Sequence, residues 1–419
     1  MPEYSSVAVW GEGAVFKNFG HVELLYGGLD SKVSIYNYGT IGSSSPEDIY
    51  IRAGADNTLV NTGTIGSADV SLSLTTGNYD VGYGANHITN HGDIFGDVDL
   101  SGPADTILKN TGTIHGETSI TGKLINHGDI HSLNVDGAHA VLLNYGTVGV
   151  DGGELILAGS SGIVLRNEGV IANSASNGSA ITDRGEAGFE RNTIINTGEI
   201  QGNLGLYSTE GTKIINDGLI KGSVFFWSGD DVYIEGENAA INGHLDTIGG
   251  AEGDDFISVR SNYAFVYGGP GKDILSSSGE GGFLFGEAGD DILRLVGGSY
   301  RAWGGDGNDH IVFTGRATGS AGLRGDDGDD IIINRSTDGF EVVMMGGAGN
   351  DLMVEKATVS IKDGIASGNA TTKVYYEGNQ ADYEVLAIAP DQVQGHQTAP
   401  TSWNSSIWSS SLIPSIMRR

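Results

Sequence analysis

The stretch NTGTIHGETSITGKLINHGDI, residues 110–130, contains two copies of one short phrase: an asparagine, a glycine two positions later and an isoleucine two positions after that. This phrase, Asn-x-Gly-x-Ile/Val, occurs ten times between residues 18 and 220, and short β-type runs such as AVLLN lead into it. Successive asparagines are 16 to 29 residues apart. Self-similarity at such a period is typical of repeat architectures. The asparagines are Asn18, Asn37, Asn61, Asn90, Asn110, Asn126, Asn144, Asn167, Asn196 and Asn216.

The repeat predicts strands, because its short segments alternate apolar and polar residues and show no 3.6-residue period. A strand–turn unit of about 20 residues cannot bury its own apolar face, so neighbouring units must stack. We therefore predict an all-β fold, a right-handed parallel β-helix or β-solenoid with a rise of about 4.8 Å per coil.

Within each phrase the asparagine and the isoleucine have the same parity, so both are expected to point inward. We predict that the asparagine amides form a hydrogen-bonded ladder along the stack, which is a structural role. The glycine is expected to supply a turn conformation that a Cβ atom would resist.

A second repeat follows. Around Gly229 the phrase changes, and a nonapeptide of the form G-G-x-G-x-D-x-U-x, where U is apolar, begins at Gly250. Its copies start 18, 18, 18, 21 and 21 residues apart. They read GAEGDDFIS, GGPGKDILS, GEAGDDILR, GGDGNDHIV, GDDGDDIII and GGAGNDLMV, starting at Gly250, Gly268, Gly286, Gly304, Gly325 and Gly346.

The residue types of the nonapeptide suit calcium. Glycines let successive carbonyls point toward one spot, and the aspartate at position six adds a carboxylate. Calcium takes six to eight oxygens at 2.3–2.6 Å, more than one turn offers, so an ion belongs between two stacked turns. Because nine residues make half a coil, the 18-residue spacing places matching turns on one edge, while the opposite half-coils lack the G-x-D core. We expect one column of about five Ca²⁺ ions. A phosphate-binding loop does not fit, because no helix pattern and no GK[ST] follows.

Residues 250–354 resemble the RTX family, whose hemolysin-type calcium-binding repeats form a β-roll in proteins exported by type I secretion systems. The resemblance implies carboxylate ligands at position six and backbone carbonyl ligands at the glycines. The carboxylates are Asp255, Asp273, Asp291, Asp309, Asp330 and Asp351. The glycines are Gly250, Gly253, Gly268, Gly271, Gly286, Gly289, Gly304, Gly307, Gly325, Gly328, Gly346 and Gly349.

Two positions of the repeat vary. The second glycine is replaced by Ala251, Glu287 and Asp326, which puts the geometry of those three turns in question. At position five we expect solvated side chains, among them Asp254, Asp290 and Asp329.

Composition limits the partners. The 419 residues include 53 acidic and 22 basic side chains, a formal net charge of −31, which disfavours nucleic acids and anionic membranes and suits hard cations. There is no cysteine, hence no disulfide. Neither a secretory signal nor an apolar run of the roughly 20 residues needed to span a membrane is visible. With the RTX resemblance, this predicts an extracellular or cell-surface location, reached through type I secretion machinery without a cleavable signal.

We divide the chain into a β-solenoid (1–228), a calcium β-roll (229–360) and a C-terminal segment (361–419). In the last segment, KVYYEGNQADYEV (373–385) is similar to a segment that often follows RTX arrays, and we interpret it as a cap. The polar residues beyond 389 are expected to be either a disordered tail or an export signal, and the resemblance favours the signal.

Two function classes fit. The first, which we favour, is a non-enzymatic surface or matrix protein, adhesin-like, that folds on meeting external calcium and binds surface or matrix polysaccharide. The second is a carbohydrate-active enzyme, a hydrolase, lyase or epimerase, on the first solenoid. Its candidate groups come from the phrase NHGDI and are His91, Asp93, His127 and Asp129, which we interpret first as variable surface positions. A third idea, crystal-surface binding by Thr-x-Thr pairs, is weak because only two coils carry a full pair.

Overall fold

The structure is a computed structural model. It describes residues 6–9, 11–27, 32–42, 49–50, 57–66, 72–73, 85–100, 105–158, 162–173, 178–184, 190–242, 247–298, 300–317, 319, 321–339, 342–355, 359–362, 373–376, 407–409 and 415–417.

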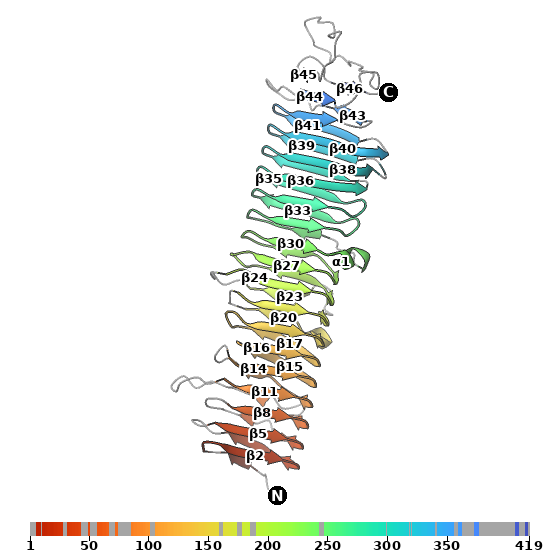
Figure 1. Cartoon of the computed structure of the whole chain (residues 1–419). Coiled ribbons are helices and arrows are strands. Elements are labelled where there is room, and N and C mark those ends of the chain that lie inside the picture. Colours follow the sequence, from red (N-terminus) through yellow and green to blue (C-terminus); the bar gives the residue numbers. More distant parts are fainter. Residues whose placement is uncertain are drawn as a thin grey trace, which may run out of the picture. The chain divides into compact units, whose positions relative to one another are not determined.

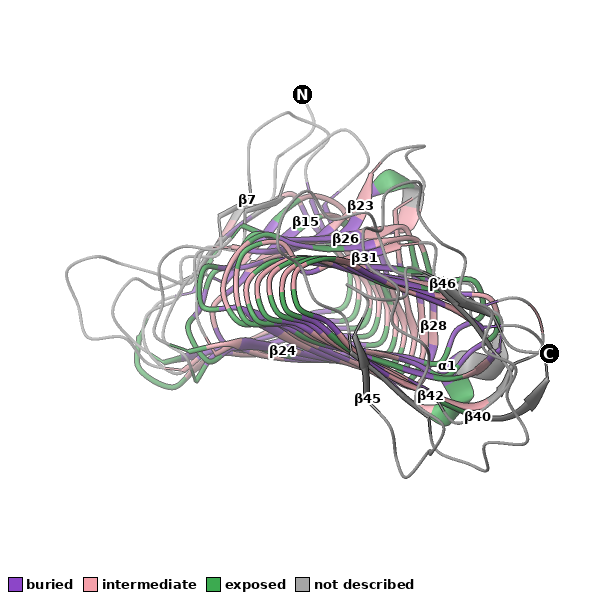
Figure 2. Cartoon of the chain, turned by 90° about the horizontal axis from the view of Figure 1, so that it is seen from above, coloured by how far each residue is buried: buried purple, intermediate pink, exposed green. Residues whose placement is uncertain are grey.

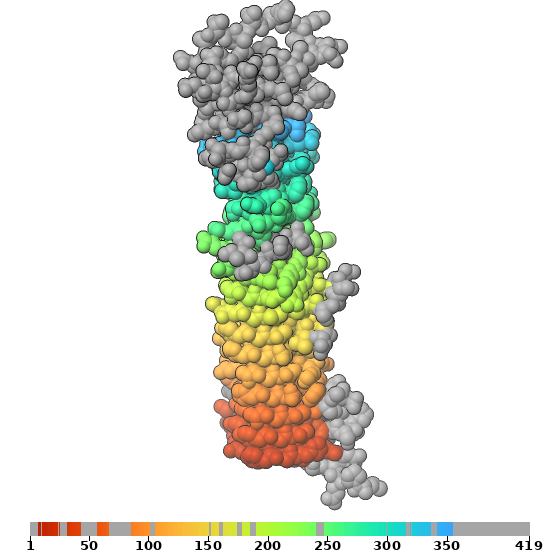
Figure 3. Space-filling model, turned by 90° about the vertical axis from the view of Figure 1, so that its right-hand side faces the viewer, coloured from red at the N-terminus to blue at the C-terminus, as the bar shows by residue number. Residues whose placement is uncertain are grey.

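The chain divides into two compact units, Met1–Val224 and Phe225–Arg419. Each unit is a parallel β-solenoid, so the predicted all-β solenoid class is confirmed. In each unit the strands stack coil upon coil (Figure 1), and the colours of the sequence follow one another in bands along the stack (Figure 3). The described helical segments are short: the α-helix α1 (Glu237–Asn242) and the 3-10 turn η1 (Val150–Gly152).

In the first unit, one sheet is formed by the strands that lead into the repeated phrase, and each of them ends at a phrase asparagine. They pair in parallel and in register, with each asparagine opposite the next. These strands are β2 (Ala14–Asn18), β5 (Val33–Asn37), β8 (Thr58–Asn61), β11 (His87–Asn90), β14 (Ile107–Asn110), β16 (Lys123–Asn126), β18 (Val141–Asn144), β21 (Val164–Asn167), β24 (Asn192–Asn196) and β27 (Thr212–Asn216).

The second sheet of this unit begins after the phrase glycine. Its strands are β3 (His21–Val22), β6 (Thr40–Ile41), β9 (Thr64–Ile65), β12 (Asp93–Ile94), β13 (Val98–Leu100), β15 (Thr113–Ile120), β17 (Asp129–Val135), β19 (Thr147–Val148), β20 (Leu155–Leu157), β22 (Val170–Ala172), β23 (Ser179–Asp183), β25 (Glu199–Gln201), β26 (Asn203–Leu206) and β28 (Leu219–Lys221). Two small pairs lie apart, β1 (Ser6–Val9) with β4 (Leu24–Gly27) and β7 (Ile49–Tyr50) with β10 (Leu72–Ser73). Strand β29 (Val224–Phe226) contains the unit boundary.

The second unit also has two parallel sheets. The first contains β30 (Val232–Glu235), β32 (Phe256–Val259), β34 (Ile274–Ser277), β36 (Ile292–Gly298), β38 (His310–Ala317), β40 (Ile331–Gly339), β42 (Leu352–Glu355), β44 (Lys373–Tyr376) and β45 (Ile407–Ser409). The second contains β31 (Thr247–Gly249), β33 (Phe265–Pro270), β35 (Phe283–Ala288), β37 (Arg301–Asp306), β39 (Ala321–Asp327), β41 (Val342–Ala348), β43 (Val359–Lys362) and β46 (Ser415–Met417).

The core lies between the two sheets of each coil. Side chains alternate along the strands, as in β5, where Val33, Ile35 and Asn37 are buried and the two residues between them are half-exposed. Seen from the end, the buried positions line the inside of the stacked coils (Figure 2). Because the register is kept from coil to coil, identical parities stack and every strand contributes to one apolar interior.

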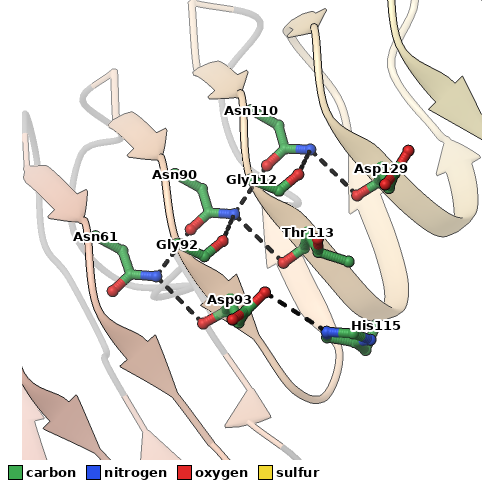
Figure 4. A network of polar contacts seen from close by, with 9 residues as sticks. All are labelled: Asn61, Asn90, Gly92, Asp93, Asn110, Gly112, Thr113, His115 and Asp129. Carbon is green, nitrogen blue, oxygen red and sulfur yellow. Dashed lines mark hydrogen bonds and ion pairs between the residues drawn. The ribbon is translucent and has the colours of Figure 1, made fainter.

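The buried asparagines form the predicted ladder. Each side-chain Nδ2 donates to Oδ1 of the asparagine on the next coil, as from Asn90 to Asn110 (2.8 Å) and from Asn110 to Asn126 (2.9 Å). The same Nδ2 atoms also donate to backbone carbonyls of the following turn, such as that of Thr113 (Figure 4). Nine such amide–amide bonds link the ten coils, so the prediction of an inward structural ladder is confirmed.

The phrase glycine is needed for close approach and does not adopt the left-handed conformation that a special turn would demand. A Cβ atom on Gly112 or Gly128 would lie under 3.0 Å from the carbonyl oxygen of the phrase glycine one coil earlier. These glycines are absent from the described residues with positive φ. Stacked backbones therefore meet at this column, and only glycine leaves room for them.

At the C-terminal end, β44 continues the parallel stack on β42 and then pairs in antiparallel fashion with β45. Strand β43 pairs in the same antiparallel way with β46. Most of the predicted cap and of the predicted export signal falls outside the described residues.

Candidate metal centre

The six position-six aspartates form a buried column along one edge of the second unit. Each side chain is at most 2% exposed. Asp273 accepts the backbone N–H of Asp255 through its Oδ1 (2.8 Å), and its own N–H donates to Oδ1 of Asp291 (2.7 Å). The same bond continues to Asp309, Asp330 and Asp351. The 18- and 21-residue spacings thus place these turns on one edge, and one carboxylate oxygen per aspartate is used for stacking.

The other carboxylate oxygen, Oδ2, points at the glycine that opens its own turn. A Cβ atom on Gly268 would lie under 3.0 Å both from Oδ2 of Asp273 and from the carbonyl oxygen of Gly286 on the next coil. A side chain at the first position would fill this space. The same pairing, a carboxylate from one turn and a glycine carbonyl from the next, recurs at Gly250, Gly268, Gly286, Gly304 and Gly325.

The six turns share positive φ values at their second and fourth positions. The fourth-position glycines all have positive φ, from 132° at Gly307 to 157° at Gly271. The second-position glycines do too, from 114° at Gly269 to 121° at Gly347. Ala251, Glu287 and Asp326, which replace the second glycine, keep positive φ values of 68°, 77° and 78°. The substituted turns therefore share the left-handed geometry of the others, at the strain that a side chain brings to this region.

Position five is exposed and forms a separate outer ladder. Oδ1 of Asp254 accepts the N–H of Lys272 (2.8 Å), and Oδ1 of Asp290 accepts that of Asn308 (3.0 Å). Lys272 also donates through Nζ to Oδ2 of Asp290 (2.9 Å). Asp329 accepts the N–H of Asn350 in the same way. The expectation that these aspartates lie in solvent is confirmed.

The structure adds a seventh carboxylate to the column. Oδ1 of Asp255 accepts the backbone N–H of Asp231 (2.7 Å), and Asp231 is 2% exposed. Its turn, SGDD, keeps the glycine with positive φ (Gly229, 94°) but begins with Phe226 and Trp227 in place of glycines. The G-D-D core, which it shares with the turn at Gly253, was the signal that could have found it.

Burial governs the charge of the column. Desolvation is the largest cause that raises the pKa of Asp273 to about 8, and the neighbouring Asp255 and Asp291 carboxylates raise it further against the lowering effect of the Asp255 N–H. The same balance raises the pKa of Asp291 to about 6, and those of Asp309 and Asp330 to about 7. Without a counter-charge, these carboxylates therefore hold their protons to a higher pH than an exposed aspartate does, and Asp273 favours the protonated form at neutral pH.

This oxygen set fits a hard cation. The Oδ2 atoms of Asp273, Asp291, Asp309 and Asp330 are buried and accept no hydrogen bond from the described residues. A buried carboxylate oxygen beside a carbonyl oxygen is unfavourable unless a proton or a cation lies between them. The described residues contain no cluster of three or more His, Cys, Asp or Glu side chains suited to a metal. The expected calcium shell is of another kind, because it combines few carboxylates with backbone carbonyls.

The candidate groups of the first unit are not gathered into one cluster. Asp93 and Asp129 both lie opposite Thr113 in the parallel register, so one coil separates them. His91 contacts Oγ1 of Thr111 (2.6 Å), and Asp93 lies 3.8 Å from Nε2 of His115 (Figure 4). The ring of His127 stacks on Tyr145. These contacts join neighbouring coils and leave no observation that favours the enzyme hypothesis.

No protein-family model matches the chain, and comparison with curated proteins and with solved structures gives no match. Among the described residues, no helix has the length and apolar character that crossing a membrane requires.

Proposed function

We propose that this protein is an extracellular, calcium-binding β-solenoid protein whose second unit folds on meeting external calcium. The calcium ions would lie in one column of about five, each held by Oδ2 of a position-six aspartate and by backbone carbonyls of the opening glycines on two stacked turns. Bound calcium would supply the counter-charge that the buried carboxylates need. The position-six aspartates and the opening glycines hold neighbouring turns one coil apart.

One observation carries this proposal. Five times in succession, a buried carboxylate oxygen of one turn and a glycine carbonyl of the next face the same space, which a Cβ atom would fill. If the acidic residues of these turns had no ligand to bind, their carboxylates would be expected to point into solvent, as those at position five do here.

Calcium would couple location to folding. A ligand that binds only the folded state stabilises it by mass action, and extracellular calcium modules bind with dissociation constants of about 10⁻⁴–10⁻³ M. In a compartment with little free calcium, those carboxylates that are ionised would repel one another and shift the roll toward its unfolded state. The RTX resemblance of residues 250–354 supports export by type I secretion machinery. A non-enzymatic, adhesin-like role at the surface or in the matrix is the function we assign.

The test is circular dichroism of the full chain in EGTA, in Ca²⁺ and in Mg²⁺. We expect the strand signal to increase with Ca²⁺ and to change little with equal Mg²⁺, which favours a smaller, octahedral site. Equilibrium dialysis should give about five bound ions. Strand content that is the same in EGTA and in Ca²⁺ would contradict the folding proposal, and dialysis without bound ions would contradict the site itself.

A further inference from the structure

The outer face of the second sheet in the second unit carries stacked aromatic rings. Phe265 stacks on Phe283 (ring centroids 4.6 Å apart), and in the neighbouring column Tyr267 stacks on Phe285 (4.7 Å), which stacks on Trp303 (4.7 Å). The stacked planes are within 10° of parallel. We call these five rings, together with Phe225, the aromatic strip. Such exposed aromatic surface mostly marks an interaction site.

The second column has one ring missing. Tyr267 lies opposite Gly249 on the preceding coil. Ser228 forms a parallel β-bridge with Glu252. If this register is followed back by three residues along both segments, Phe225 lies opposite Gly249. Cδ1 of Phe225 lies 3.9 Å from where a Gly249 Cβ would be. Phe225 and Tyr267 therefore lie on either side of a coil that has a glycine at the matching position. Two coil spacings separate them by about 9.6 Å.

The backbone and the packing do not require glycine at this position. Gly249 is an extended strand residue outside the set of described glycines with positive φ. A Cβ atom there would make only an ordinary contact, whereas one on Gly250 would collide with a carboxylate. The missing ring is therefore a feature of the surface.

We infer that this one-ring gap is a binding subsite for a pyranose ring of a neutral glycan, seated between Phe225 and Tyr267. Rings in this column lie 4.7 Å apart, so one further ring fits between the two walls at the same spacing. A pyranose presents apolar C–H faces to the two aromatic walls and a rim of hydroxyl groups to its surroundings. Thr247, two residues before Gly249 on the same face, and the Tyr267 hydroxyl supply hydrogen-bonding groups at that rim.

Charge selects a neutral sugar. The described positions around the gap on this face are Thr247, Ala251 and Phe265, all uncharged, and the first ionisable residue that follows β31 is Glu252. The two arginines of the face, Arg301 and Arg324, lie opposite Phe283 and Trp303 and are three and four coils beyond Gly249. With a net charge of −31 on the chain, an acidic glycan would be repelled. The strip continues for two coils past Tyr267, so a chain of sugars could run along it.

The test is isothermal titration of the calcium-saturated full chain with neutral hexasaccharides (β-1,4-glucan, β-1,3-glucan, β-1,4-xylan) and with an acidic one (oligouronate). Gly249→Phe fills the gap with the missing ring, and Tyr267→Ala removes one wall. Gly322→Phe is the matched control, because Gly322 lies on the same face and its Cβ would likewise meet one atom, Cγ of Arg301, at 3.9 Å.

We expect at least one neutral hexasaccharide to bind, with affinity at least tenfold weaker in Gly249→Phe and in Tyr267→Ala and unchanged in Gly322→Phe. Circular dichroism in calcium shows whether each variant is folded, and Gly249→Phe should keep the wild-type spectrum. The inference fails if no neutral glycan binds, if only the oligouronate binds, or if Gly249→Phe binds like the wild type. It does not rest on the calcium proposal, whose failure would appear in the chelator experiment.

Discussion

Asp291→Asn should stabilise the calcium-free protein and reduce the stabilisation that calcium adds. Asn keeps Oδ1, which accepts the N–H of Asp273, and replaces the buried Oδ2 by an amide. That amide can donate to the Gly304 carbonyl, which faces the same space. The substitution thus removes the charge and leaves the stacking bond in place.

The size of the expected change in folding free energy follows from the burial of Asp291. Burial raises the pKa of Asp291 from 3.8 to about 6, so holding it ionised at pH 8 costs about 3 kcal/mol of folding free energy. Asp291→Asn should therefore stabilise the calcium-free protein by up to about 3 kcal/mol. In calcium at ten times the dissociation constant, each site contributes about 1.4 kcal/mol, and the variant should lose that gain at one site.

The assay is urea unfolding followed by circular dichroism at pH 8, in EGTA and in calcium. Asp290→Asn is the matched control: it is the adjacent, exposed residue, and it should change the calcium response little. The reasoning is refuted if Asp291→Asn weakens the calcium-free protein, or if calcium stabilises the variant as much as the wild type. Either result would make the carboxylate a structural acceptor and not a cation ligand.

Three further outcomes are expected. In EGTA, Asp273, Asp309 and Asp330 have pKa values of about 7 to 8, above the unfolded value, so the folded state holds protons that the unfolded state releases. The stability that these three carboxyl groups contribute should then be fully present below about pH 4 and fall as pH rises to 8. Saturating calcium should flatten this slope. Urea midpoints that rise with pH in EGTA would contradict the prediction. Asn126→Ala removes the bonds to Asn110 and Asn144 and leaves buried groups unpaired, so thermal unfolding of the first unit should show a loss of about 3 kcal/mol, against less than about 1 for the exposed His127→Ala. Gly128→Ala drives a Cβ into the Gly112 carbonyl and should destabilise the first unit. Gly322→Ala adds a Cβ that makes only an ordinary contact with Arg301, so it should leave the melting temperature unchanged or slightly raised.

Periodicity in the sequence was enough to determine the fold class, the inward asparagines and the edge on which six aspartates stack. These follow from parity and repeat length, which any stacked coil must obey. The left-handed φ at Ala251, the place of Asp231 in the column and the reason for glycine at Gly112 came only from the tertiary structure. Each depends on what lies on the adjacent coil, and coils of unequal length do not reveal their register in advance. The same holds for the gap at Gly249, because a missing ring has meaning only between the rings that stand beside it.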